Sequence, residues 1–162
     1  CFKNCKLLTE VEFDQTVCEI GNNSFSFTSL SSAEFPNVTS ADSAFEGTKI
    51  VVADLPLVKS TYRTFADCSL LASVNMPSLE DVGNFTFYGC TSLNNIDLGG
   101  VKSVGVSAFK SSSITAASLP ECEFVDRQAY LCLSLKHFAT ILFRIAVILK
   151  ISISIIWKNL TM

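Results

Sequence analysis

One pattern of apolar residues recurs along most of this chain. The segments FADCSLLASVNM (65–76) and FYGCTSLNNIDL (87–98) both place an aromatic residue first, then Cys at +3, Leu at +6, a branched aliphatic at +9 and an apolar residue at +11. The aromatic positions are separated by 23, 20, 20, 22, 22 and 21 residues. They are Phe2, Phe25, Phe45, Phe65, Phe87, Phe109 and Tyr130. Self-similarity at such a period predicts a stack of equivalent units, none of which buries its apolar face alone.

The centre of each unit has the pattern of a short β-strand. Its apolar pair alternates with polar residues, so the pair points inward and its neighbours point outward. Proline follows the strand in most units and ends it, because proline has no N–H for the ladder. A period of 20–23 residues with LxxVxL at its centre is a leucine-rich-repeat pattern. We therefore predict a leucine-rich-repeat solenoid with a concave parallel β-sheet and an irregular or short-helical convex side. The expected structural ladder consists of Phe25, Phe45, Phe65, Phe87, Phe109 and Tyr130.

Three stretches carry a closer resemblance: SAFEGTKIVVADLP (43–56), TFADCSLLASVNMP (64–77) and SAFKSSSITAASLP (107–120). With the aromatic residue, Cys and Pro in these places, the chain resembles the BspA-like, or Treponema-type, leucine-rich repeats from Cys1 to about Leu135. The resemblance implies a non-enzymatic, protein-binding role in adhesion, at the cell surface or secreted, with a host or neighbouring-cell protein as partner. An intracellular scaffold, or a truncated or frameshifted product without function, stays open as an alternative.

Composition excludes several other classes. A net charge of −3 lacks the basic stripe that nucleic-acid binding requires. The single histidine, His137, offers no Cys–His or Ser–His–Asp set, so no enzyme, catalytic residue or cofactor is predicted. The 7 cysteines include no CxxC pair, and we expect no metal site.

The cysteines fit the repeat instead. One position, three residues after the aromatic anchor, holds Cys5, Cys68, Cys90 and Cys132. Cys18 and Cys122 lie in the second inward segment of their units. Because buried Cys behaves as a small hydrophobe, we expect free, buried thiols rather than disulfides between neighbouring units.

The outward strand positions supply the candidate binding residues. Stacking would align them as columns about 4.8 Å apart on the concave sheet, and four of the six residues in the central column are acidic. Adjacent exposed like charges repel by about 1 kcal/mol in water, so the column is a candidate docking surface for a basic or polar protein; a merely solvated strand face is the alternative. The predicted binding residues are Glu10, Glu12, Glu34, Asp54, Asn75, Asn95, Asp97 and Ser118.

The pattern ends near Leu135, which predicts a solenoid over residues 1–135 and a separate apolar tail over 136–162. The run 139–157 is apolar, yet Arg144 and Lys150 interrupt it, each costing about 2.5–3.5 kcal/mol at mid-bilayer. Three interpretations stay open: a repeat translated out of frame, a membrane anchor, or a capping segment. Sequencing the coding DNA separates the first from the others. Since the chain starts on Cys1 within a repeat and shows no targeting signal, we expect a fragment of a longer protein.

Overall fold

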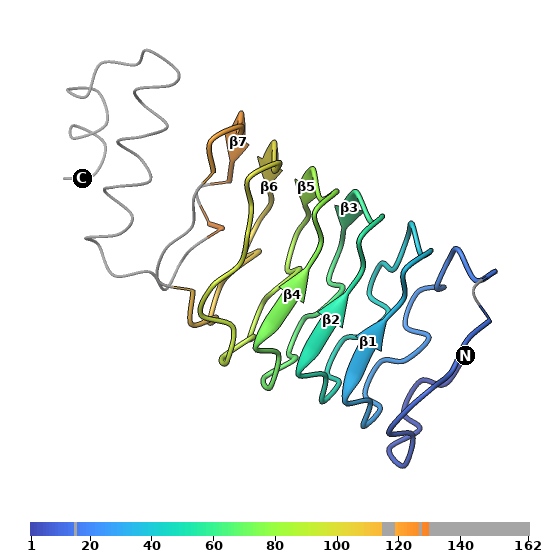
Figure 1. Cartoon of the computed structure of the whole chain (residues 1–162). Helices are drawn as coiled ribbons and strands as arrows, with labels where there is room; N and C mark the ends of the chain where they lie inside the picture. Colours follow the sequence, from blue (N-terminus) through green and yellow to red (C-terminus); the bar gives the residue numbers. More distant parts are fainter. Residues whose placement is uncertain (15, 115–118, 127, 130–162) are drawn as a thin grey trace, which may run out of the picture. The chain divides into compact units, whose positions relative to one another are not determined.

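The computed structural model of the chain describes residues 1–14, 16–114, 119–126 and 128–129. All of these residues belong to one compact unit, Cys1–Cys132. Within it the chain winds through repeated turns, whose short strands form two separate parallel sheets (Figure 1). The predicted solenoid with stacked parallel strands is confirmed. Tyr130, Ser118, Cys132 and the tail 136–162 lie outside the described residues, so the predictions made for them stay predictions.

The first sheet contains the strands that the LxxVxL pattern predicted. Its order is β1 (Ser32–Glu34), β2 (Val52–Asp54), β4 (Ser73–Asn75). Ala33, Ala53 and Val74 are paired in register; the two alanines are fully buried and Val74 is half-buried. The residues on either side of this inward column face outward, as period-two alternation requires.

The second sheet lies on the side for which irregular or short-helical structure was predicted (Figure 1). Its order is β3 (Ser60–Thr61), β5 (Asp81–Val82), β6 (Ser103–Val104), β7 (Phe124–Val125). Turns surround these short strands, and the described part of the chain contains no helix. The inward pair Leu79/Val82 is spaced i, i+3, which suits a helical turn as well as a turn followed by a strand. Spacing alone therefore could not separate the two.

The aromatic anchors stack through the interior as a continuous ladder. From Phe2 to Phe109, consecutive ring centroids lie 5.5, 5.8, 5.6, 5.8 and 5.6 Å apart, with interplanar angles between 7° and 11°. Phe45, Phe65 and Phe87 have no exposed surface. Burying one such side chain stabilises the fold by about 1.5–3 kcal/mol, and each aromatic pair adds about 0.5–1.5 kcal/mol. The ladder therefore couples each turn to both of its neighbours.

A third set of backbone bonds, which the sequence did not predict, accompanies the ladder. Each anchor N–H donates to the carbonyl of the residue just before the next anchor, as from Phe45 to Thr64 at 3.1 Å.

The residues two before and two after an anchor adopt positive φ. They are Asn4, Asn23, Phe27, Ser43, Gly47, Arg63, Asp67, Phe85, Gly89, Ser107 and Ser111. This left-handed conformation explains the Gly, Asn and Asp at these positions. Phe27, Arg63 and Phe85 are the bulky exceptions.

Candidate functional site

The first sheet brings together three of the predicted binding residues. Glu34, Asp54 and Asn75 occupy the outward position of β1, β2 and β4 and are paired in register. The Asn75 side-chain amide donates to Asp54 Oδ1 at 2.7 Å, and this bond offsets part of the repulsion between the two neighbouring carboxylates. These three residues form a row of polar side chains, here called the acidic row, along which a partner could form hydrogen bonds with successive turns.

Four other predicted residues are exposed but lie outside the strands of this sheet. Glu10 and Glu12 belong to the first turn, and Asn95 and Asp97 follow β4 along the chain. Asp97 Oδ1 accepts the N–H of Gly99 at 2.9 Å, which turns the chain where the other units have proline. The structure therefore shows strand alignment for three of the eight predicted residues, and Ser118 lies outside the described part of the chain.

Exposed apolar surface lies beside the acidic row at β2. Val51 and Val52 are 43% and 45% exposed, and Val52 is paired with Ser32 and Ser73 on the neighbouring strands. Val52 lies on the same outward face of β2 as Asp54. Apolar side chains beside a charged row provide the mixed chemistry that protein interfaces use.

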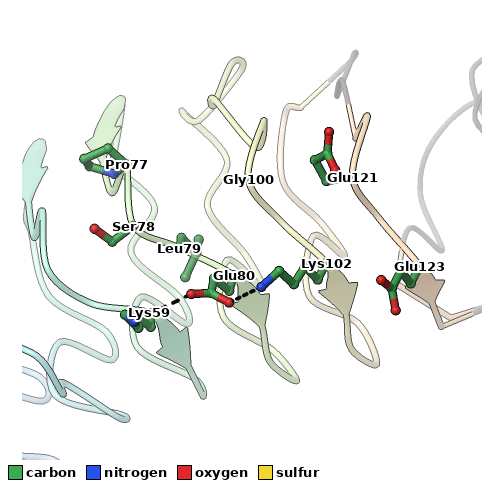
Figure 2. Close-up of a pocket in the computed structure, with 9 residues that line it drawn as sticks. All are labelled: Lys59, Pro77, Ser78, Leu79, Glu80, Gly100, Lys102, Glu121 and Glu123. Atoms are coloured by element: carbon green, nitrogen blue, oxygen red, sulfur yellow. Dashed lines mark hydrogen bonds and ion pairs between the residues drawn. The ribbon is translucent and has the colours of Figure 1, made fainter.

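A shallow groove of about 430 Å³ lies along the segments that lead into the strands of the second sheet (Figure 2). Its lining includes four charged residues in one column, one from each successive turn: Lys59, Glu80, Lys102 and Glu123. The carboxylate of Glu80 bridges two lysines, at 3.7 Å from Lys59 Nζ and in close contact with Lys102 Nζ. The hydrogen bond from Lys102 lowers the pKa of Glu80, and the same bond raises the pKa of Lys102. Sequence reasoning missed this column, although its members alternate in sign at spacings of 21 and 22 residues.

The buried cysteines are structural. Cys68, Cys90 and Cys122 are buried and free, as predicted for them. The Cys68 and Cys90 thiols lie 3.0 and 3.1 Å from the anchor carbonyls of the preceding turns, at Phe45 and Phe65, and donate to them. Burial raises the pKa of the Cys68 thiol to about 11, which keeps it protonated and unreactive at neutral pH.

The prediction of burial was wrong for two cysteines. Cys5 and Cys18 are free but exposed. Both belong to the first turn, which packs against a neighbouring turn on one side only, so the layer that covers Cys68 is missing there. The repeat position alone therefore does not determine burial; the presence of a turn on both sides does.

The described residues offer neither a metal-binding cluster nor a membrane-spanning helix. Within the described ranges, no group of three or more His, Cys, Asp or Glu side chains is placed to hold a metal ion. Over the same residues, no helix has the length and apolar character needed to cross a bilayer.

Comparisons with known proteins agree with this geometry. Residues 1–115 and 59–142 match the family described as BspA type Leucine rich repeat region, in 6 copies. The crystal structure of a leucine-rich repeat protein from Bacteroides ovatus is similar, with a TM-score of 0.58 and 24% sequence identity over 77% of this chain. The chain spans 40% of the length of that protein. Comparison with curated proteins finds no significant match.

Proposed function

Because the chain belongs to the BspA-type leucine-rich repeat family, we propose that it is a non-enzymatic protein-binding module that serves adhesion, at the cell surface or as a secreted protein. The observation that carries the proposal is the acidic row, in which Glu34, Asp54 and Asn75 present side chains in register on one face. Stacked repeats place equivalent side chains at regular intervals on one surface, which suits the binding of an extended protein partner.

The electrostatics favour a basic or polar partner. Glu34 and Asp54 are neighbours across parallel strands, whose spacing is about 4.8 Å. Their repulsion in the free protein, about 1 kcal/mol at such a separation in water, would be relieved when a basic side chain approaches. The exposed Val51 and Val52 supply apolar contact beside this charge. Charge therefore favours one class of partner and apolar area adds to the affinity.

The test reverses the charge of the two acids in the acidic row and of the two acids at the equivalent position of other turns, Glu12 and Asp97. The variant Glu12→Lys, Glu34→Lys, Asp54→Lys and Asp97→Lys should abolish attachment of the labelled protein to host or neighbouring cells, while its circular dichroism spectrum stays unchanged. A matched control reverses four exposed acids elsewhere, at Glu19, Asp81, Glu121 and Glu123, and should attach as the parent does. Equal attachment by both variants would reject the acidic row as the binding surface.

The location is tested separately. An antibody against the repeats should label intact, living cells that express the full-length protein, or should detect that protein in the culture medium. Labelling that appears only after the cells are permeabilised would reject the surface role and favour an intracellular scaffold.

A further inference from the structure

A cluster of aromatic and charged side chains lies on the turns that carry the anchors, away from the strands of the first sheet. It is called here the Arg63 patch. Its members are Glu46, Tyr62, Arg63, Asp67, Phe85 and Tyr88, which come from three successive turns of the solenoid and are exposed or half-buried.

The side chains of the patch are already organised in the free protein. The Arg63 guanidinium forms an ion pair with Glu46 and lies over the ring of Phe85, with Cζ 5.4 Å from the ring centroid. The Phe85 ring meets the Tyr88 ring edge to face at a centroid distance of 6.0 Å. A surface ordered before binding loses less side-chain freedom when a partner arrives.

Two bulky residues of the patch have a left-handed backbone conformation that bulky residues disfavour. Arg63 and Phe85 stand two residues before their anchors, with φ of 51° and 59°. Asn23, Ser43 and Ser107 occupy the same place in other turns, and small polar residues accept this conformation more readily than bulky ones do. Disfavoured backbone conformations held at bulky residues cluster at functional sites, and Phe, Tyr and Arg are the residue types that dominate protein interfaces.

The charge of the patch is unbalanced. Glu46 and Arg63 neutralise one another, whereas the exposed carboxylate of Asp67 has no hydrogen bond or ion pair within the described residues. Partial burial, followed by the charge of Glu46, raises the pKa of Asp67. The backbone N–H of Asp67 donates to the carbonyl of Tyr88 at 2.6 Å, and the Asp67 carboxylate oxygen Oδ1 lies against Gly89, the residue after Tyr88. An excess carboxylate therefore stands on the turn that carries Phe85 and Tyr88.

We propose that the Arg63 patch binds a basic side chain, Lys or Arg, of a protein partner. The carboxylate of Asp67 would pair with the cation, and the rings of Tyr62 and Tyr88 would flank it, because a cation is attracted to an aromatic face. The contact of Arg63 with Phe85 already shows this geometry inside the patch. The inference rests on the proposed protein-binding function but locates a second contact on a different surface from the acidic row.

The experiment titrates the isotope-labelled chain with a tetra-arginine peptide at physiological salt and follows the backbone amides by NMR. The expected result is a saturable shift of the amides of Arg63, Asp67, Phe85 and Tyr88, in addition to any shift along the acidic row, and no shift of the patch amides with tetra-glutamate. Asp67→Asn should weaken peptide binding by at least about threefold, the size expected for an exposed ion pair beside an aromatic ring. Glu19→Gln, the matched control, removes one exposed negative charge outside the patch and outside the predicted binding residues, and should bind as the parent does.

A second variant protects the test against misfolding. Phe85→Asn suits the left-handed backbone and should preserve the fold, yet it removes the ring that orders Arg63 and Tyr88 and should also weaken peptide binding. Three results would each overturn the proposal: patch amides that shift no more than amides near exposed acids outside the patch and the acidic row, equal losses of affinity in Asp67→Asn and Glu19→Gln, or parental affinity in Phe85→Asn. If reversal of the acidic row abolishes cell attachment while the patch amides show no shift with the peptide, the Arg63 patch is rejected as a binding site and the proposed function is retained.

Discussion

Replacing the central ring of the aromatic ladder should destabilise the whole solenoid. Phe65 has no exposed surface and stacks between Phe45 at 5.6 Å and Phe87 at 5.8 Å. Phe65→Leu keeps an apolar side chain but removes two aromatic pairs of about 0.5–1.5 kcal/mol each, so we expect a loss of about 1–3 kcal/mol in the free energy of unfolding. Phe65→Ala also creates a cavity and should cost about 3–5 kcal/mol.

The matched control is the first ring. Phe2 is 44% exposed and stacks on one neighbour only, so Phe2→Leu should cost less than about 1 kcal/mol. Urea denaturation followed by circular dichroism gives both values, and an unchanged slope with denaturant would show that the exposed area is the same. Equal costs for Phe65→Leu and Phe2→Leu would refute the ladder as the element that couples the turns.

Three other expectations concern single buried positions, each measured by denaturation. Among the described residues the buried Thr64 hydroxyl has no hydrogen-bond partner, so Thr64→Val should stabilise the fold by about 1 kcal/mol. Thr86→Val removes the hydrogen bonds of a buried hydroxyl to Thr61 and Gly83 and should destabilise the fold by a similar amount. A Cβ at Gly83 would lie 1.9 Å from a backbone carbonyl oxygen of the adjacent turn, so Gly83→Ala should cost about 3 kcal/mol, while Gly21→Ala, at 3.4 Å from its nearest neighbour, should be tolerated. Above pH 9 the Cys68 thiol ionises in the unfolded chain, whereas the folded chain keeps it protonated up to its pKa of about 11. The free energy of unfolding should therefore fall as the pH rises from 9 to 11, and the Cys68→Ala variant should lack this contribution to the pH dependence.

The features set by repetition could be predicted from the sequence. The anchors, the inward column of Ala33, Ala53 and Val74, and the registration of the first sheet follow from a regular spacing, because a residue at one place in the repeat meets its counterparts in the neighbouring turns. The acidic row follows for the same reason. The exposure of Cys5 and Cys18 does not, since their turn has a neighbour on one side only.

The features set by backbone conformation and by contacts between unlike positions could not be predicted. The left-handed residues on both sides of each anchor include Arg63 and Phe85, which no turn rule identifies. The Arg63 patch joins Glu46 to Arg63 and Arg63 to Phe85, which come from three different turns. Glu46 stands one residue after its anchor, whereas Arg63 and Phe85 stand two residues before theirs. The second sheet was missed because its inward pairs, spaced i, i+3, fit a helical turn equally well.

The claim on which the other conclusions depend is that one aromatic-cored stack holds both sheets and their exposed rows in register. Native-state hydrogen exchange tests it most directly, because the anchor N–H groups of Phe25, Phe45, Phe65 and Phe87 all donate to the following turn. A single cooperative array predicts that these four amides exchange only through global unfolding, with one common free energy. Fast exchange at Phe45 or Phe65, while their neighbours stay protected, would contradict it.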